Sequence, residues 1–568
     1  MNKDFDVCVI GSGAGGGPVA LSLARAGYSV VVLEKGPWLR DEDLRKDELA
    51  CCRRYTYTPD PREEPHVVET EDDDGGWLAN TTHRSGWTFW NGNCVGGSSN
   101  FMSGYFHRLK PVDFRLRETF GPVEGANVAD WPIAYEDLEP YYSLVEEEVG
   151  ISGRVRPHPH LEPRSRPDFP YPALAEHPIA GMIDQAAQAL GYHAFPTPRA
   201  ILPFAAKGRK GCTYNGGLCG SSGCSTGAKG SSRAALLDQA VATGRCEIRP
   251  HAMVSRLVSD PTGRLTNVEY FDKDGHLQRL DAGIYVVACQ AIESARLLLR
   301  SVGPRHTSGL ANGSGQVGRN LLFAGGGAAS GRLVYAQFPQ TQAEALKDSR
   351  TFINRALQDW YEIDDPEFGP PAKGGTIDFV HRHPSPIARA HDQVQGADGL
   401  RWGLALKRRL EAHFREGPYI KVEAFSDWMP VDDCSVRLDP EVKDKWGLPV
   451  ARVRTGYHVQ NLRVGWYLAA KGAEVLRQMG AQDVVSFATG TPPTNLVAGT
   501  CRFGNDPAAS VLDRDCRAHE VENLFVTDGS FMPTGGSVPY TWTIYANAFR
   551  VADRIVRQLG GPRVQVAA

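Results

Sequence analysis

Three glycines near the start of the chain have a spacing that suits contact with a pyrophosphate. They are Gly11, Gly13 and Gly16, in the pattern Gly-x-Gly-x-x-Gly. The first makes a tight turn, the second lets backbone N–H groups approach the phosphates, and the third lets a helix pack closely on the preceding strand. Glu34 follows about twenty residues later, the spacing of an acid that accepts hydrogen bonds from a ribose. The pattern predicts a dinucleotide site and does not by itself distinguish FAD from a nicotinamide.

The elements that must position these residues are indicated by the flanking sequence. Residues 7–10 are a short apolar run, which predicts a buried parallel strand. Residues 19–26 predict a helix that ends at Gly27, and residues 29–33 predict a second buried strand that ends at Glu34. The pyrophosphate is then expected at the helix N-terminus, where unpaired N–H groups and the helix dipole favour an anion.

The rest of the chain predicts a second domain and a return to the first. Between about 330 and 485, aromatic and charged residues alternate as in antiparallel strands with one solvated face. Residues 524–527 predict a strand that rejoins the first sheet. We expect an α/β protein with a Rossmann-type nucleotide domain over residues 1–330, with loop insertions at about 40–90 and 150–210. A substrate domain on an antiparallel sheet is expected at 331–485, and a return to the first domain at 486–568.

Composition restricts the partners. The 568 residues carry 62 basic and 66 acidic side chains, a net charge of −4, without a long block of one sign. This balance gives no support for nucleic acid or a membrane surface as partner. The acidic run 69–74 predicts a solvated loop. No secretory signal pattern and no apolar run of about twenty residues is found, which predicts a cytoplasmic protein without a membrane segment.

Several stretches together resemble the glucose-methanol-choline (GMC) oxidoreductases over nearly the whole chain. They are the glycine loop with Glu34 and residues 95–99, 130–142, 291–299, 316–321, 499–502 and 526–534. The resemblance implies the GMC fold, FAD as cofactor, and hydride transfer from a hydroxyl-bearing carbon to flavin N5. The likeness is greatest to the bacterial sugar and glucoside dehydrogenases, so we expect a dehydrogenase or oxidase acting on a small hydroxylated substrate, a sugar or glycoside.

The same resemblance implies the residues that contact FAD. They are Gly11, Gly13, Ala14, Gly16, Glu34, Lys35, Gly96, Gly97, Ser98, Ser99, Asp528 and Gly529. In the family, residues like 96–99 lie along the cofactor, and residues like Asp528 and Gly529 approach its phosphoribityl part.

The catalytic positions depart from the family pattern. Alcohol oxidation needs a base for the hydroxyl proton, and the family places a His three residues before Gly-Thr and a His or Asn about forty residues later. Here Leu496 and Val538 are assigned to these positions, and neither side chain can accept a proton.

Three interpretations follow. A base comes from elsewhere, with His381, His383, His458 or Tyr540 as candidates and with Asn495 and Tyr540 orienting the hydroxyl. His381 and His383 are alternate residues of a predicted strand and would face the same side. Alternatively the substrate is already activated or is not an alcohol, or the chain binds FAD in a non-redox role. The electron acceptor stays open.

Three cysteines form a separate cluster. Cys212, Cys219 and Cys224 stand among glycines, and thiolates in such a loop suit a metal or an iron–sulfur cluster. Some sugar dehydrogenases that the chain resembles carry a three-iron cluster on a similar block, although this loop lacks one of the usual cysteines. We favour a structural loop with reduced thiols or one disulfide, and keep the three-iron cluster as the alternative.

Overall fold

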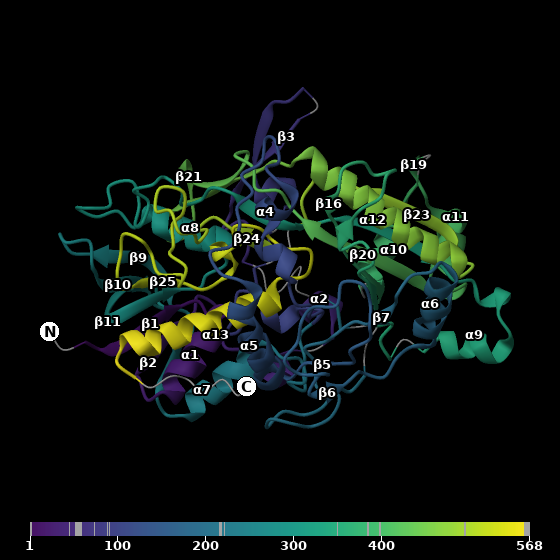
Figure 1. Cartoon of the computed structure of the whole chain (residues 1–568), viewed down its shortest axis with the longest axis horizontal. Coiled ribbons are helices and arrows are strands. Elements are labelled where there is room, and N and C mark those ends of the chain that lie inside the picture. The colour runs from purple at the N-terminus through teal and green to yellow at the C-terminus, as the bar shows by residue number, and fades with distance from the viewer. Residues whose placement is uncertain are drawn as a thin grey trace.

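Two sheets lie side by side along the longest axis of the molecule (Figure 1). The structure is a computed structural model. The residues it describes are 3–44, 46–51, 59–72, 74–87, 89, 91–214, 219–220, 222–348, 350–382, 385–396, 399–493 and 496–561. The N-terminus marks the end of the molecule that holds the first sheet, and α12 (Val459–Gln478) lies over the second sheet at the other end.

The first sheet is the predicted nucleotide-binding sheet. Its parallel strands, in spatial order, are β8 (Cys246–Arg249), β2 (Val30–Leu33), β1 (Phe5–Ile10), β11 (Leu277–Val287) and β25 (Leu524–Val526). Residues 7–10 are fully enclosed, which explains why that strand is apolar on both faces. Leu524 pairs with Tyr285, so the predicted return of the C-terminal segment to the first sheet is confirmed.

Helices from both ends of the chain cover this sheet. α1 (Gly16–Arg25) packs against α13 (Thr541–Gln558), and α13 packs against α5 (Tyr135–Val145). α5 continues through Pro140. The proline removes one backbone hydrogen bond, and the buried rings of Tyr141 and Tyr142 hold the helix against the core.

The two halves of the long strand β11 pair with their neighbours in different ways. Its first half pairs antiparallel with β10 (Leu265–Phe271), which pairs with β9 (Met253–Ser259), and its second half lies in the parallel sheet. α8 (Ala291–Arg300) follows β11 directly and packs against β9. The end of β11 therefore brings α8 beside the glycine loop that follows β1.

The second sheet confirms the expected antiparallel architecture. Its strands, in spatial order, are β23 (Gln482–Ala488), β13 (Gly327–Arg332), β20 (Tyr419–Asp427), β17 (Gly375–His381), β14 (Arg355–Leu357) and β7 (Phe195–Pro196). β12 (Leu321–Gly325) joins β20 to β24 (Val497–Gly499). One face packs against α12, where Val464 and Leu468 meet Ile420 and Val422. The other face is available to build a site.

A third sheet joins an N-terminal excursion to the middle of the chain. β3 (Val67–Glu71) pairs with β4 (Trp77–Thr81) and with β22 (Pro449–Thr455), which pairs with β21 (Cys434–Lys443). Glu69 is buried in β3 and accepts hydrogen bonds from Arg437, Arg452 and Arg454. The prediction of a solvated loop at 69–74 is therefore wrong at its first residues, because three guanidinium groups compensate the buried carboxylate.

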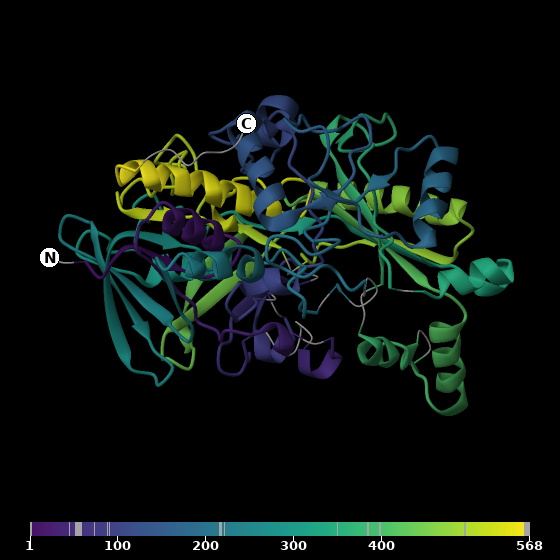
Figure 2. The ribbon, with the colours of Figure 1, turned by 90° about the horizontal axis from the view of Figure 1, so that it is seen from below.

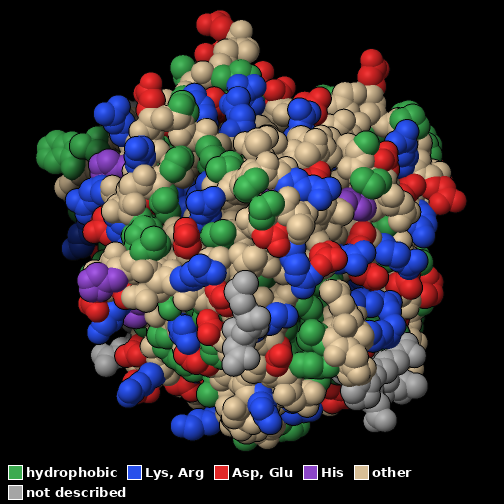
Figure 3. All heavy atoms as spheres, turned by 90° about the vertical axis from the view of Figure 1, so that its left-hand side faces the viewer, with side chains coloured by type: hydrophobic (Ala, Val, Ile, Leu, Met, Phe, Trp, Pro, Cys, Tyr) green, Lys and Arg blue, Asp and Glu red, His purple; other side chains and the backbone are tan. Residues whose placement is uncertain are grey.

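The remaining helices lie at the periphery. They are α6 (Pro178–Ala189), α9 (Gln340–Leu346), α10 (Pro386–His391) and α11 (Gly403–Arg415). Figure 2 shows the green segment that contains α10 and α11 projecting from the body. On the face shown in Figure 3, basic and acidic side chains are interspersed, as the near-neutral composition suggests. Among the described residues, each helix is too short or too polar to cross a bilayer.

Candidate active site

A cavity of about 290 Å³ extends from the glycine loop to the second sheet. Residues 10–15 and 33–35 of the first sheet line it, and Glu423 and Phe425 of β20 line it from the second sheet. Its other walls come from residues 91–93, 97–99, 102–106, 252–254, 288–290, 496–497, 528–529 and 539–541, together with Phe89, Glu293, Leu297, Arg300 and Ile544. A single space therefore connects the predicted nucleotide site with the substrate domain.

The glycine loop has the geometry that its sequence pattern predicts. Gly11 has φ of +96°, and a Cβ there would lie 2.3 Å from the carbonyl oxygen of Ala288. A Cβ on Gly16 would lie 2.1 Å from the carbonyl oxygen of Gly11, so the helix start touches the preceding turn. A Cβ on Gly13 would meet no atom within 4 Å, and this residue lines the cavity. The absence of a side chain at Gly11 and Gly16 therefore allows close backbone packing, whereas at Gly13 it leaves space for a ligand.

Glu34 is buried where β2 meets the cavity. Its Oε2 accepts hydrogen bonds from the backbone N–H of Ser12 at 3.1 Å and from the Ser12 hydroxyl, and its Oε1 accepts one from the N–H of Gly36 at 2.9 Å. Burial raises the pKa of this carboxyl, and these hydrogen bonds oppose the rise. A carboxylate oxygen has two acceptor positions, so Oε1 can still accept a ribose hydroxyl.

A second glycine segment touches the first. Gly97 has φ of +56°, and a Cβ there would lie 3.2 Å from the Cα of Gly13. Gly97, Ser98 and Ser99 line the cavity, whereas Gly96 lies behind the wall and donates its N–H to the hydroxyl of Ser12 at 2.9 Å. The two glycine segments therefore approach the cavity together.

Asp528 stabilises the part of the cavity wall that comes from the C-terminal segment of the chain. Its Oδ2 accepts from the N–H of Gln290 at 3.1 Å and from the hydroxyl of Ser294, and its Oδ1 accepts from the N–H of Ser530 at 2.8 Å and from that residue's hydroxyl. Burial raises the pKa of Asp528, and the four hydrogen bonds oppose the rise. Because these donors use its acceptor positions, Asp528 fixes the backbone of Gly529 against the cavity.

The cavity fits the cofactor that the sequence predicts. The glycine segments, the free acceptor position of Glu34 and the adjoining side chains of Met253 and Val254 suit an adenosine diphosphate group at one end. Ten of the predicted contact residues line the cavity, and Gly16 and Gly96 support it from behind. The ten are Gly11, Gly13, Ala14, Glu34, Lys35, Gly97, Ser98, Ser99, Asp528 and Gly529.

The two altered catalytic positions differ in how they meet the cavity. Leu496 lines it, whereas Val538 is buried in the hydrophobic core beside Pro539 and Tyr540, which line the wall. None of Leu496, Pro539 and Val538 can take a proton. The Tyr540 hydroxyl is buried, and the described residues offer it no hydrogen-bond partner. Burial raises the pKa of Tyr540 well above its ordinary value, so the phenol is a donor and not a base.

The described histidines that were candidates for the base lie away from the cavity. His381 has its Nε2 3.0 Å from the carbonyl oxygen of Thr351, and its ring packs edge-on against His177. Burial and the charge of His177 lower the pKa of His381 to about 4. His458 precedes α12, where its Nδ1 accepts from the N–H of Gln460 at 3.1 Å and its Nε2 lies 2.9 Å from the carbonyl oxygen of Glu124. His383 and Asn495 lie outside the described residues.

The sequence interpretation missed the contribution of β20. Glu423 and Phe425 line the cavity, and Tyr105 lines it from the segment that follows the second glycine segment. The alternation of charged and apolar residues over 419–427 could have indicated that these side chains share one face. It did not indicate which face would meet the nucleotide domain.

A buried polar network holds the wall that contains Pro539 and Tyr540. Asp427 at the end of β20 accepts from the N–H of Gly536 and, at 3.2 Å, from the hydroxyl of Ser537. Lys373 donates to the same hydroxyl at 2.6 Å and lies 3.2 Å from Asp113. Burial raises the pKa of Asp427 to about 6, although Lys373 opposes the shift.

The cysteine loop surrounds a separate small void of about 20 Å³. Burial raises the pKa of Cys212 to about 11, and Lys46 lies 3.5 Å from the sulfur of Cys219. Burial alone would raise the pKa of Cys224, but the Lys229 ammonium lowers it below the ordinary value. The three thiols are free, and their sulfurs do not all lie within 4.8 Å of one another, so the described geometry does not form a single-metal site.

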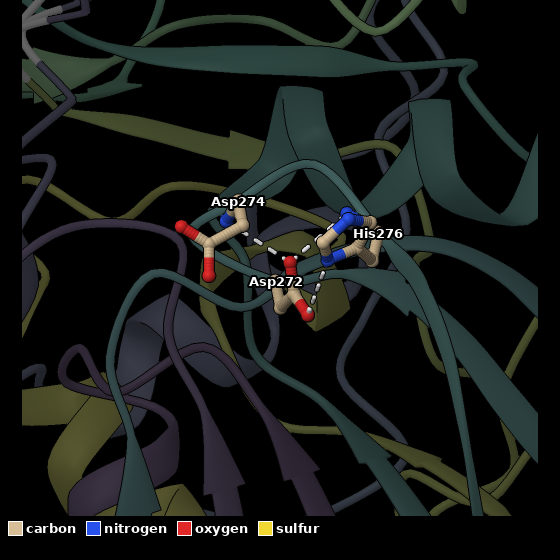
Figure 4. A group of neighbouring side chains, drawn as sticks. All are labelled: Asp272, Asp274 and His276. Carbon is tan, nitrogen blue, oxygen red and sulfur yellow. Dashed lines mark hydrogen bonds and ion pairs between the residues drawn. The ribbon is translucent and has the colours of Figure 1, made fainter.

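The described residues do contain one compact group of three metal-type side chains. Asp272, Asp274 and His276 form the turn between β10 and β11 (Figure 4). Asp272 accepts from the N–H groups of Asp274 at 3.0 Å and His276 at 2.9 Å. These bonds stabilise the turn, and the group lies at the start of β11, far along the sheet from the end of β11 that leads into the cavity residues Ala288 and Cys289.

The comparisons with known proteins agree with this geometry. Two GMC oxidoreductase family models match residues 170–323 and 430–548. The chain is 32% identical to 2-methyl-1,2-propanediol dehydrogenase of Mycolicibacterium austroafricanum, over 97% of this chain and 95% of the relative. It is 33% identical to paromamine 6'-oxidase of Streptomyces fradiae, over 98% and 92%. A solved structure of Aspergillus oryzae formate oxidase, determined to study modification of its FAD, has the same fold, with a TM-score of 0.63, 16% identity and coverage of 98% and 99%. The chain therefore belongs to the GMC oxidoreductase family.

Proposed function

We propose that this GMC oxidoreductase uses FAD to oxidise a hydroxyl-bearing carbon of a sugar or glycoside. The observation that carries the proposal is the cavity, because it joins the two glycine segments and the buried carboxylate of Glu34 to a space beside the second sheet. FAD in this cavity would supply a two-electron acceptor for a hydride from the substrate carbon.

The residues of the chain have separable roles in this proposal. Gly13 and Gly97 admit the cofactor backbone, and Glu34 accepts a ribose hydroxyl through Oε1. Asp528 keeps the backbone of Gly529 in place. At the other end, the side chains of Leu496, Pro539 and Phe425 are apolar and would limit the water that reaches the reacting carbon.

The substrate class is supported by the relatives. Besides paromamine 6'-oxidase and the propanediol dehydrogenase, they include 6'''-hydroxyparomomycin C oxidase of Streptomyces lividus, 32% identical over 99% of this chain, and the fructose dehydrogenase large subunit of Gluconobacter japonicus, 25% identical over 98%. Each of these enzymes is named after a small hydroxylated molecule, and most of these molecules are sugars or aminoglycosides. The polar groups of Glu423, Tyr105 and Tyr540 at the second-sheet end would suit such a molecule.

The test is an anaerobic screen of flavin reduction. Purified protein should release FAD on denaturation, and its flavin absorbance should bleach when the right sugar, glycoside or simple alcohol is added without oxygen. Readmitting oxygen, a quinone or a protein acceptor then identifies the oxidant. Protein that takes up no FAD would contradict the cofactor assignment. An FAD-loaded protein that no hydroxylated compound bleaches would contradict the reaction.

A further inference from the structure

We infer that the Glu423 carboxylate is the base that takes the substrate hydroxyl proton. The inference rests on the proposed oxidation and adds the residue that replaces the missing histidine. It begins from the placement of Glu423 in the fold: a carboxylate on the second sheet reaches the same cavity as the glycine loop and Leu496.

The register of β20 turns Glu423 toward the cavity. Ile420 and Val422 pack on the α12 side of the sheet. Since successive residues of a strand point to opposite faces, Glu423 and Phe425 point away from α12, and both line the cavity. The Glu423 side chain is 16% exposed, so solvent or a ligand can reach it.

The other carboxylates among the described residues of the cavity wall are Glu34, Asp528 and Glu293. Glu34 and Asp528 are fixed by the hydrogen bonds described above. Glu293 accepts a hydrogen bond from Arg296 at 3.1 Å and lies 2.7 Å from the Nε2 of His66. All three lie on the nucleotide side of the cavity, whereas Glu423 comes from the substrate-domain sheet.

The neighbours of Glu423 suit a carboxylate that gains and loses a proton. Lys421 donates to its Oε1 at 2.6 Å and favours the ionised form. Asp378 is its direct cross-strand neighbour on β17, and two like charges in this position repel each other. His107 at 3.1 Å and the Thr197 hydroxyl at 2.7 Å bind the Asp378 carboxylate. Asp378 is thereby held by its own partners, and Glu423 is the member of the pair that faces the substrate space.

Two more of the described residues near Glu423 are Tyr105, which carries a phenol, and Ala328, which carries a methyl group. Burial and, after it, the charge of Glu423 raise the pKa of Tyr105, so Tyr105 stays a donor at neutral pH. On the other neighbouring strand, β13, Ala328 stands opposite Glu423 and cannot titrate. Among the described residues that line this end of the cavity, the proton acceptor is therefore Glu423, with Tyr105 and Tyr540 as donors to the substrate oxygens.

The step balances with FAD as the oxidant. The hydroxyl proton passes to a carboxylate oxygen of Glu423, and FAD, when bound, would accept the C–H electron pair with its hydrogen as a hydride. The C–O bond of the substrate becomes a carbonyl, and two electrons leave the carbon. Glu423 then returns its proton to solvent, which its partial exposure permits.

The principal test compares Glu423→Gln with the parent protein and with Glu411→Gln, a matched change on the exposed helix α11. We expect Glu423→Gln to retain FAD and to slow anaerobic flavin reduction by about a hundred- to ten-thousand-fold, the usual loss for a general base. Its equilibrium flavin difference spectrum with a non-oxidisable substrate analogue should be unchanged. Glu411→Gln should behave as the parent does.

Chemical rescue separates a base from a structural carboxylate. In Glu423→Ala, added acetate can enter the vacated space and accept the proton, so the rate of flavin reduction should rise with acetate concentration. Parent-like reduction in Glu423→Gln would overturn the inference. So would a slow Glu423→Ala that ignores acetate or that has lost the analogue-induced spectrum, because either result assigns Glu423 to structure. A parent protein that no substrate bleaches is a different result, which contradicts the proposed function itself.

Discussion

At its nucleotide end the cavity is lined by two glycine segments, whereas at the second-sheet end it is lined by residues of β20 and of segments far apart in sequence. At the first end a Cβ on Gly11 would lie 2.3 Å from the carbonyl oxygen of Ala288, and a Cβ on Gly97 would lie 3.2 Å from the Cα of Gly13. At the second end Glu423, Leu496 and Tyr540 could each be replaced by a residue of similar size without closing the cavity. The difference indicates that residues at the nucleotide end are constrained by the space available, whereas residues at the second-sheet end are constrained by their chemistry. Mutations at the first end should therefore impair FAD binding, and mutations at the second end should impair flavin reduction.

The largest expected effect is at the nucleotide end. Gly11→Ala should abolish FAD binding and lower the melting temperature, because its Cβ would meet the carbonyl oxygen of Ala288 at 2.3 Å. Gly27→Ala is a matched control, since Gly27 has a similar φ of +92° and open space around it. The free energy of unfolding of the control variant should fall by only about 1–2 kcal/mol, because alanine is strained in a left-handed conformation. The control should keep its FAD. Bound flavin and thermal melts measure both. Equal loss in the two variants would show that backbone strain, and not the close approach, sets the constraint.

The wall behind Tyr540 should give a pH-dependent effect. Burial raises the folded-state pKa of Asp427 to about 6, so this group lowers the free energy of unfolding as pH rises from about 4 to 6. Above that range its contribution is constant, at most about 3 kcal/mol. Asp427→Asn should remove this part of the pH dependence, measured by denaturant melts between pH 4 and 8. The exposed Asp433→Asn serves as control. Parallel curves for parent and Asp427→Asn would contradict the assignment.

Replacing Tyr540 should change the rate of flavin reduction without lowering the melting temperature. Its buried hydroxyl has no hydrogen-bond partner among the described residues, so Tyr540→Phe should leave the melting temperature unchanged or raise it. If the phenol donates to the substrate, flavin reduction should slow by about tenfold, the equivalent of one hydrogen bond. A large fall in melting temperature would show instead that the hydroxyl serves the fold.

His381 should affect only stability. Because its ring packs on His177 away from the cavity, His381→Ala should reduce flavin at the parent rate while unfolding at lower denaturant concentration. Stopped-flow reduction and equilibrium melts distinguish these quantities. A hundredfold slower reduction with FAD still bound would restore His381 as a candidate base and weaken the case for Glu423.

The cysteine loop should have the smallest effect. Cys224→Ser should leave flavin reduction by substrate unchanged, and anaerobically prepared protein should contain no stoichiometric iron. Metal analysis and thiol titration measure this directly. Iron in stoichiometric amount, with absorbance that persists after the flavin is reduced, would favour the three-iron alternative.

The sequence predicted most where local backbone geometry determines the structure. The turn at Gly11, the strand that ends at Glu34 and the return of residues 524–526 to the first sheet were all predicted, because each follows from a short pattern with a fixed geometric meaning. The catalytic end was predicted poorly. Glu423 reaches the cavity only because β20 lies between β13 and β17 in one register, and no short pattern specifies that pairing. The sequence also did not indicate that Pro539 and Tyr540 would face the cavity while Val538 faces the core, because the turn before α13 decides which side chains point inward.

The pairing of β25 with β11 has a consequence for biosynthesis. The strand at residues 524–526 and the helix that follows complete both the sheet and the cavity wall, so most of the chain must leave the ribosome before the nucleotide site exists. The nascent N-terminal half therefore remains without its flavin. It exposes a sheet edge that only the last tenth of the polypeptide, which contains β25, can cover. Loading of the flavin is then a late event, and premature termination anywhere before residue 524 should yield colourless, aggregation-prone protein.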